Sequence, residues 1–324
     1  MQYRTFGRTG WQVSEIAFGG WQIGGDWGRV DDDDSIRTLH HAFDRGVNFV
    51  DTAELYGSGH SEDVVGRAVR QWTGTRIYVA TKIQPVVWPD PDDDQPEMRG
   101  RYPRWHLRAG VEAALRRLRT DRIDLLQLHS WMPAGLHELD WLETLNELRV
   151  KGKVDHIGVS LRDYRPDEGA DLARLGLTDS IQVVFNLFEQ RPADRLFPAG
   201  LATDTAYIAR VPFDSGSLIG HWIPQTYDRW EPGSVPDTLF RGDRFAQTLQ
   251  RVEELKKVCA PSYPTLAEAA MRYTLSSPEV KTVIPGMAST SDVDHSVAYS
   301  DGAPFPDELR RQLRGHVWPR NFYK

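Results

Sequence analysis

Residues 47–59 read VNFVDTAELYGSG and join an apolar segment directly to an aspartate, a tyrosine and two glycines. Residues 47–50 are typical of a buried strand, so Asp51 comes where the chain is expected to leave the core. An unpaired carboxylate at the edge of an apolar interior is costly. The segment therefore predicts that Asp51 pairs with another polar group at a strand end, with Tyr56 close by.

Short apolar segments alternate with amphipathic stretches along the whole chain. The expected strands are residues 13–20, 47–53, 77–83, 123–130, 154–161, 180–188, 206–213 and 280–287. Between them lie helical patterns, the first of which is expected to be capped by Asp34 or Ser35. Strands that alternate with helices pair in parallel, and at 324 residues the leading closed arrangement is a (β/α)8 TIM barrel. We expect one such domain over residues 1–324, with its active site at the C-terminal mouth.

The alternative to the barrel is an open, doubly wound sheet. Its signature is a GxGxxG motif after the first strand. The first apolar segment ends AFGGWQIGGDWG, which does not have that spacing. Two segments interrupt the alternation, residues 84–104 and 214–244, and both follow strands; they are expected either to overhang the mouth of the barrel or to be solvated surface loops.

Composition and charge exclude several classes of function. Hydrophobic residues make up 40% of the chain and charged residues 26%, and no apolar run is long enough to span a bilayer. A net charge of −7 disfavours a nucleic-acid-binding surface and suits a protein that handles small molecules. The first ten residues lack the features of a secretion signal. A single cysteine, Cys259, fits a reducing compartment, and we expect the protein to be cytoplasmic.

Polar residues recur at the ends of the expected strands. Asp51 ends the second strand, Lys82 the third, His129 the fourth and Ser160 the fifth, and Gln182 lies in the sixth. Each alone has an ordinary structural explanation, such as a helix cap or a satisfied core residue. Because the C-terminal strand ends of a barrel converge on one pocket, we expect these side chains to pair with each other there.

The chain resembles the aldo-keto reductase superfamily over almost its whole length. The resemblance is carried by RTFGRTGWQVSEIAFGGWQIGG, GVNFVDTAELYGSGHSEDVVGRAV, VATKI, IDLLQLH, GKVDHIGVS and VIPGM, and DTAELYG is the most specific of these motifs. It implies a metal-free enzyme that reduces a small-molecule aldehyde or ketone with a nicotinamide cofactor bound across the barrel mouth. By this resemblance the catalytic residues are Asp51, Tyr56, Lys82 and His129.

The chemistry of carbonyl reduction gives each of these residues a role. Hydride transfer develops negative charge on the carbonyl oxygen, which then needs a proton, and a free phenol with a pKa of about 10 is a reluctant acid. The ammonium of Lys82 stabilises the phenolate of Tyr56, while Asp51 neutralises and orients Lys82. His129 is expected to hydrogen-bond the carbonyl oxygen and fix its approach.

The resemblance also implies a set of cofactor-binding residues, and some of them depart from the family pattern. The set is Gly20, Trp21, Ser160, Gln182, Arg210, Pro212, Ser215, Ser217, Leu218, Pro285, Gly286, Met287, Ala288, Asp292 and Ser296. Leu161 stands where an asparagine usually follows Ser160, and Arg210 stands where an aromatic ring often stacks on the nicotinamide. Ala288 and Asp292 stand where a cation often meets the 2′-phosphate of NADP. NADP(H) is therefore favoured on family grounds, NAD(H) is possible, and discrimination between them is expected to be weak.

Three tryptophans follow expected strands and are candidates for the substrate pocket. Trp21, Trp88 and Trp131 offer flat apolar surface that suits sugars or aromatic carbonyls. Two other functions stay open: a lyase that forms a Schiff base on Lys82, and a cofactor-binding regulatory protein like the β subunits of potassium channels in the same superfamily. The carbonyl substrate, the physiological direction and the oligomeric state are left open.

Overall fold

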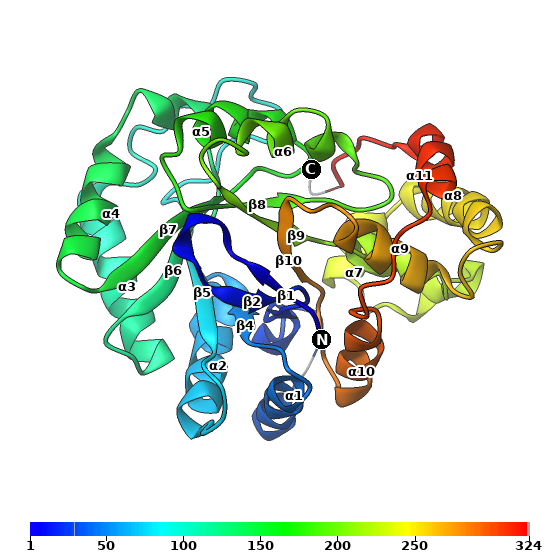
Figure 1. Cartoon of the computed structure of the whole chain (residues 1–324), viewed down its shortest axis with the longest axis horizontal. Coiled ribbons are helices and arrows are strands. Elements are labelled where there is room, and N and C mark those ends of the chain that lie inside the picture. The colour runs from blue at the N-terminus through cyan, green and yellow to red at the C-terminus, as the bar shows by residue number, and fades with distance from the viewer. Residues whose placement is uncertain (29, 323–324) are drawn as a thin grey trace.

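The computed structural model of the chain describes residues 1–28 and 30–322 (Figure 1). In these residues eight parallel strands form one sheet in the order β10-β9-β8-β7-β6-β5-β4-β3. Isolated bridges from Ile16 to Val283 and from Gly19 to Gly286 join its two edges, so the sheet is a nearly closed (β/α)8 barrel. The strands are β3 (Phe18–Gly19), β4 (Phe49–Asp51), β5 (Tyr78–Ile83), β6 (Ile123–Leu128), β7 (Val154–Ser160), β8 (Ser180–Val184), β9 (Ala206–Arg210) and β10 (Val280–Ile284).

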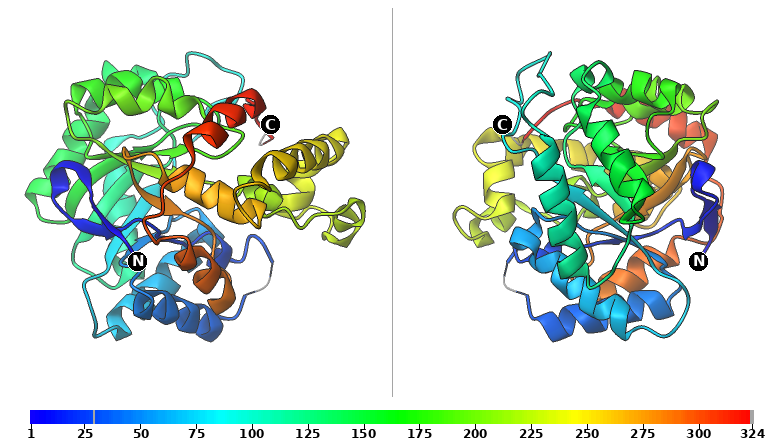
Figure 2. Two further views of the ribbon diagram at one scale, coloured as in Figure 1. Left: turned by 45° about the vertical axis from the view of Figure 1, so that its right-hand side comes forward. Right: turned by 90° about the vertical axis from the view of Figure 1, so that its left-hand side faces the viewer.

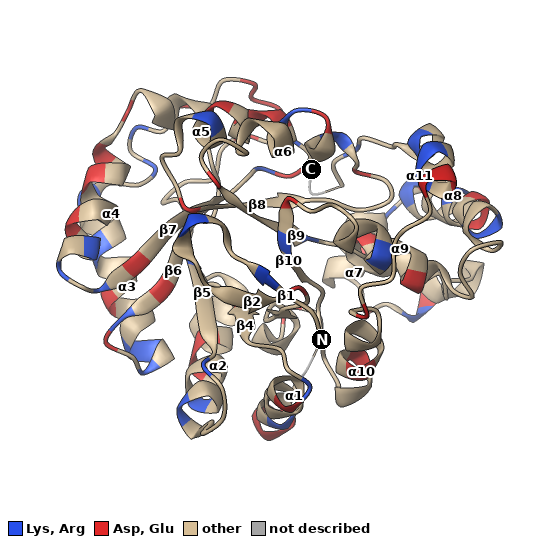
Figure 3. Cartoon of the chain, viewed as in Figure 1, with Lys and Arg blue, Asp and Glu red and all other residues tan. Residues whose placement is uncertain are grey.

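Helices surround the barrel, as expected for parallel strands that are connected by crossovers (Figures 1 and 2). Their outer faces carry charges of both signs (Figure 3). No helix among residues 1–28 and 30–322 is long and apolar enough to cross a membrane. The helices are α1 (Asp32–Asp44), α2 (His60–Gln71), α3 (Arg104–Leu118), α4 (Asp140–Val150), α5 (Ala170–Leu175), α6 (Leu196–Ala199), α7 (Val235–Phe240), α8 (Asp243–Cys259), α9 (Leu266–Leu275), α10 (Thr290–Ala298) and α11 (Asp307–Leu313).

The first expected strand, residues 13–20, is divided in the structure. Its beginning belongs to β2 (Gln12–Ser14), which pairs antiparallel with β1 (Tyr3–Thr5) outside the barrel, and only β3 enters the barrel sheet. The apolar pattern could not show this division, because a hairpin strand and a barrel strand both bury their side chains. The other expected strands are confirmed. β5 ends at Ile83, as expected, and the rest end earlier than expected, because their last expected residues already belong to loops at the mouth.

The start of the first helix also differs from the expectation. Asp31, and not Asp34 or Ser35, is the N-cap of α1, and its side chain accepts hydrogen bonds from the backbone of Asp33 and Asp34. Any residue of the acidic run could have taken this position, since aspartate is favoured both at the cap and in the first turn. The run thus starts a helix.

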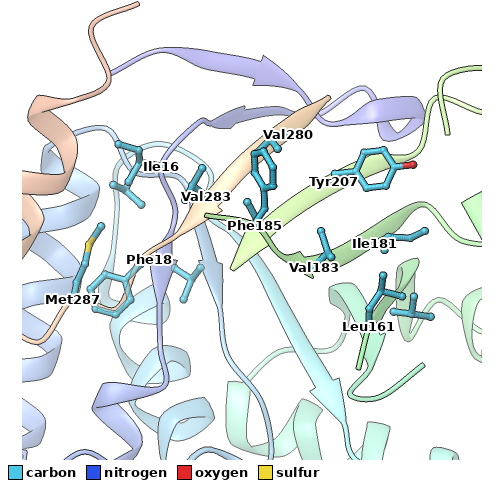
Figure 4. Packing of buried hydrophobic residues seen from close by; sticks show 14 of the residues in the cluster. Ile16, Phe18, Leu161, Ile181, Val183, Phe185, Tyr207, Val280, Val283 and Met287 are labelled. Carbon is cyan, nitrogen blue, oxygen red and sulfur yellow. The ribbon is translucent and has the colours of Figure 1, made fainter. Parts of the chain in front are cut away.

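Two apolar layers support the strands. Inside the barrel, a small cluster that includes Phe6, Phe49, Leu125 and Ile208 fills the N-terminal half. Outside, a larger cluster lies between sheet and helices, and Figure 4 shows some of its members on neighbouring strands. Because packed side chains occupy the N-terminal half, polar groups collect at the C-terminal ends of the strands.

Candidate active site

A pocket of about 580 Å³ opens at the C-terminal ends of the strands. Its size is typical of sites for small molecules and cofactors. Many residues that the sequence singles out contribute to its wall. They are Gly20, Trp21, Asp51, Tyr56, Trp88, His129, Ser160, Gln182, Arg210, Pro212, Ser215 and Gly286.

Lys82 lies beneath the pocket floor and is fully hydrogen-bonded. Its side chain is completely buried, and Nζ donates to Asp51 Oδ2 at 2.5 Å, to Thr52 O at 3.0 Å and to the Tyr56 hydroxyl at 3.1 Å. Burial alone would lower the pKa of Lys82, but the attraction of Asp51 and Tyr56 exceeds this effect and leaves the pKa raised. Lys82 is therefore an ammonium with an acceptor for each of its three N–H groups.

The carboxylate of Asp51 accepts three hydrogen bonds at the base of the site. Oδ2 accepts the one from Lys82, and Oδ1 accepts from Gln182 Nε2 at 2.7 Å and from Gln127 Nε2 at 3.3 Å. These contacts follow from the barrel, because Lys82 and Gln127 are paired in register on β5 and β6. Two amides and one ammonium thus hold the carboxylate in one orientation, as a buried charge requires.

The backbone of the helical turn η3 (Tyr56–Gly59) brings Tyr56 to the pocket. Gly57 has φ of +58°, and a Cβ on it would lie 2.0 Å from Gly24 O, so the turn needs glycine here. Asp26 accepts a hydrogen bond from Gly57 N at 3.1 Å. The Trp21 ring stacks on the Tyr56 ring with a centroid distance of 5.9 Å. The turn and the stacked tryptophan together fix the phenol above Lys82.

The electrostatics of Tyr56 combine two opposed effects. Burial of its hydroxyl raises the pKa of Tyr56 above the usual 10, and the nearby Lys82 acts to lower it. The net pKa of Tyr56 is raised, whereas its sequence neighbourhood predicts only the lowering by the ammonium. Tyr56 therefore keeps its proton at neutral pH, and Lys82 limits the cost of losing it.

His129 follows β6 and faces Tyr56 across the pocket. The two rings form an edge contact with a centroid distance of 5.8 Å. Burial, Lys82 and Arg210 all lower the pKa of His129 well below its ordinary value, so the imidazole is neutral. Its Nδ1 atom has no hydrogen-bond partner among the residues that the structure describes.

Aromatic rings wall the substrate end of the pocket, but not all of those expected. Trp21 and Trp88 line it, together with Trp27, which stands edge-on to Trp21 at 5.2 Å. Trp131 is fully buried: its indole N–H donates to Glu168 O at 3.0 Å and its ring packs against Trp141. Trp131 therefore belongs to the core behind the pocket, and its expected contact with a substrate stays a prediction that this position does not favour.

The expected cofactor-binding residues divide into two groups. Those on strand ends and on the first part of the loop after β9 line the pocket, as named above. Arg210 donates to Asp163 Oδ1 at 2.7 Å and to Leu161 O at 3.0 Å, which fixes its guanidinium at the pocket edge. Outside the pocket wall lie Ser217, Leu218, Pro285, Met287, Ala288, Asp292 and Ser296. Their contacts with a cofactor stay predictions.

Asp292 is held by the backbone at the start of α10. Its Oδ2 accepts hydrogen bonds from the backbone N–H groups of Ala288 and Ser289, each at 3.0 Å, and Ser289 caps the helix in return. No salt bridge to Asp292 occurs in residues 1–28 and 30–322. Because these two N–H groups donate to the Asp292 carboxylate, they are not available to bind an anion.

Several residues of the site were not predicted. Gln127 lies in the strand motif IDLLQLH, where a single glutamine among leucines indicates a polar side chain that points into the barrel. Arg162 and Arg165 also line the pocket, each paired with a carboxylate, Glu168 and Asp94 respectively. Asn321 is a further lining residue and shows that the C-terminal tail reaches the mouth of the barrel.

Comparison with known proteins agrees with this geometry. The sequence model of the aldo/keto reductase family matches residues 15–317. The aldo-keto reductase YhdN of Bacillus subtilis is 30% identical over 282 residues, which cover 86% of this chain and 82% of YhdN. The NADH-specific methylglyoxal reductase of Escherichia coli is 27% identical over 307 residues, with 90% of this chain and 91% of the reductase covered. The holo structure of an aldo-keto reductase from Bacillus halodurans matches with a TM-score of 0.77 at 25% identity, over 99% of this chain and 97% of that one.

Proposed function

The chain belongs to the aldo/keto reductase family of NAD(P)H-dependent oxidoreductases, and we propose that it reduces an aldehyde or ketone with Tyr56 as the general acid. The observation that carries this proposal is the hydrogen-bonded series Asp51–Lys82–Tyr56 at the pocket floor. An ammonium has only donors, so the Tyr56 oxygen accepts from Lys82. The proton of Tyr56 is thereby left to donate to a carbonyl oxygen in the pocket.

The charges at the site support this direction of proton transfer. When the phenol gives up its proton, the negative charge forms 3.1 Å from the ammonium of Lys82. Charge stabilisation in such a water-poor site is stronger than in bulk water. Asp51 keeps the ammonium in place through its hydrogen bond with Lys82.

His129 would orient the carbonyl group. Nδ1 is buried without an acceptor among the described residues, so a proton on it would be an unsatisfied donor. The tautomer with its proton on Nε2 avoids this cost and offers an N–H to the carbonyl oxygen. Because the imidazole is neutral, it positions the substrate and leaves the proton transfer to Tyr56.

The residues around the pocket fit a nicotinamide cofactor. Ser160 and Gln182 would hold the carboxamide, while Arg210, Ser215 and the chain around Gly286 would contact the rest of it. The bound cofactor would supply the hydride. Asp292 carries a negative charge at the position where NADP-dependent relatives often have a cation, so we propose that NADP(H) and NAD(H) are both accepted with little discrimination.

The pocket wall favours a flat or ring-shaped carbonyl compound. Trp21, Trp27 and Trp88 present aromatic faces and edges near Tyr56 and His129. Such surfaces suit aromatic aldehydes and the apolar faces of sugars. Of the other functions, a Schiff-base lyase is disfavoured, because attack on a carbonyl requires a neutral, accessible amine. Lys82 is a buried ammonium with all three donors engaged.

Replacing Tyr56 by phenylalanine tests the proposal. We expect Tyr56→Phe to lower kcat about 10²–10⁴-fold, the usual contribution of general acid catalysis, while cofactor affinity stays close to that of the wild type. The matched control is Tyr102→Phe, which removes a buried phenol whose hydrogen bonds, within the described part of the chain, are to the backbone of Ser130. A Tyr56→Phe enzyme that keeps more than about a tenth of the wild-type kcat would exclude Tyr56 as the acid.

A further inference from the structure

The loop that follows β9 has an unusual backbone conformation. Val211, Asp214 and Ser215 have φ values of +58°, +49° and +54°, and Gly216 follows with +100°. Left-handed conformations are unfavourable for residues other than glycine, most of all for a β-branched valine. Such a segment keeps its shape only when its surroundings hold it. Pro212, Ser215 and Gly216 line the pocket, so whatever holds this loop also shapes the cofactor side of the site.

A buried ion pair holds the loop to the C-terminal tail. The guanidinium of Arg320 pairs with Asp214, and their side chains are only 7% and 2% exposed. Asp214 Oδ2 also accepts from Ser217 Oγ at 2.6 Å, so one carboxylate ties the start of the turn η7 (Asp214–Ile219) to its middle. Removing one partner of a buried pair leaves the other charge uncompensated, which is costly.

Aromatic rings fix the position of Arg320. Its guanidinium carbon lies 4.1 Å from the ring centre of Trp318, 4.8 Å from that of Phe322 and 5.0 Å from that of Phe188. Nε and Nη1 have no hydrogen-bond acceptor among residues 1–28 and 30–322. The faces of these rings take the place of acceptors, since aromatic rings attract cations. Asp214 is therefore the principal anionic partner of this cation.

The tail is clamped on two sides. Towards the barrel, Trp318 N donates to Phe188 O at 2.9 Å. Towards the segment 222–245, Arg244 donates to Phe322 O at 2.9 Å, and Phe322 packs on Phe240. Figure 2 shows α7 and α8 (yellow-green to yellow) projecting at one side of the barrel, with α11 (red) beside them. Arg320 lies between these two anchors, and its neighbour Asn321 lines the pocket.

We propose that Arg320 is a positioning residue for cofactor binding: its ion pair with Asp214 pre-forms the strained loop 211–219 at the pocket. This inference rests on the proposed function, in which a nicotinamide cofactor lies along this loop. A pre-formed loop does not have to be ordered when the cofactor binds, so the pair raises affinity and slows release. Opening of the C-terminal tail is then the step that frees the loop and lets the cofactor leave.

The test compares cofactor binding and turnover in variants of the full chain. For Arg320→Met we expect a rise of about 10–100-fold in the dissociation constant of the reduced cofactor, from the loss of a buried partner and of pre-organisation. The dissociation rate, measured by stopped-flow fluorescence, should rise by a similar factor, whereas kcat at saturating cofactor should fall far less. Arg320→Lys should lie between Arg320→Met and the wild type, because it keeps the charge.

Further variants separate this role from a general structural one. Arg314→Gln is the matched control, since it removes a tail ion pair, to Asp194 at 2.6 Å, that does not reach the loop. Asp214→Asn should reproduce the Arg320→Met effect, and the double variant should add little to either. If the wild type binds no nicotinamide cofactor, the proposed function fails. If it binds but Arg320→Met, Arg320→Lys and Asp214→Asn all keep wild-type affinity and dissociation rates, the role of Arg320 is overturned.

Discussion

Two buried ion pairs lie beside the same pocket, and they are built in different ways. Lys82 and Asp51 are 31 residues apart on adjacent strands, and the sheet register and two glutamine side chains set their geometry. Arg320 and Asp214 are 106 residues apart, and they join a strained loop to the end of the chain. The Lys82–Asp51 pair is held in place by the barrel sheet, whereas the Arg320–Asp214 pair is held by the packing of the C-terminal tail.

This difference matches the two tasks that we assign to the pairs. Catalytic groups must be held within a fraction of an ångström, and strands provide this precision better than loops do. A loop over a cofactor must instead allow the cofactor to enter and leave, which needs a contact that can open. We therefore expect loss of the Lys82–Asp51 pair to affect the chemical step, and loss of the Arg320–Asp214 pair to affect cofactor binding.

The largest effect is expected from Lys82→Met. Without the ammonium the phenolate is not stabilised, and we expect kcat to fall about 10²–10⁴-fold with little change in cofactor affinity. Lys82 acts to lower the pKa of Tyr56, so its loss should raise that pKa further. Reduction requires the protonated phenol and declines as the pH rises through its pKa. The alkaline limit of any residual activity should therefore move to higher pH.

The pH–rate profile of Arg320→Met is the control for this comparison. Arg320 is not among the groups that shift the pKa of Tyr56, so its loss should leave the alkaline limit where it is in the wild type. Equal shifts of the profile in the Lys82 and Arg320 variants would contradict the division of tasks between the two pairs.

A smaller effect is expected from Asp51→Asn. Lys82 keeps its hydrogen bonds to Thr52 O and Tyr56, so we expect kcat to fall only about 10–100-fold, less than on loss of the ammonium itself. The negative charge of Asp51 acts to raise the pKa of both Tyr56 and Lys82. Its removal should lower both values, so the alkaline limit should move to lower pH, opposite to Lys82→Met. Shifts in the same direction for both variants would show that the pair does not tune the phenol.

Sequence reasoning succeeded where a polar residue has a fixed place relative to a strand. Asp51, Lys82, His129, Ser160 and Gln182 meet at one end of the barrel as expected, because parallel strands in a barrel bring their C-terminal ends together. The expected pairing holds for Asp51 with Lys82 and with Gln182, the hydrogen bonds that the described residues show within this set. The same regularity predicted the barrel itself. It could not divide residues 13–20 between a hairpin and a barrel strand, since both bury alternate side chains.

The residues that were missed or misplaced depend on packing between distant segments. Trp131 follows a strand end just as Trp88 follows another, and only the contact with Trp141 shows that Trp131 turns into the core. Arg320 lies in a tail whose sequence is equally compatible with a surface helix end. Its partner is a loop residue more than a hundred positions away, and no local pattern links the two.

A third acidic residue, Asp292, extends the comparison, and its replacement should have the smallest effect. Unlike Asp51 and Asp214, it has no cationic partner among the described residues and is held by the backbone N–H groups of Ala288 and Ser289. If the 2′-phosphate of NADPH lies near it, like charges about 4 Å apart cost roughly 1–4 kcal/mol, depending on the effective dielectric. We expect the wild type to use NADPH and NADH with similar kcat/KM, and Asp292→Arg to favour NADPH by about tenfold.

Two further variants serve as controls. Asp292→Asn keeps an acceptor for the helix cap and should give part of this change in preference. Asp294→Arg changes the net charge by the same amount as Asp292→Arg, but at a side chain that faces His41 and Arg45, and should leave the preference unchanged. Titration of both reduced cofactors against the four proteins measures the effect. A strong preference of the wild type for NADPH that Asp292→Arg leaves unaltered would mean that another cation holds the phosphate and that α10 does not decide cofactor choice.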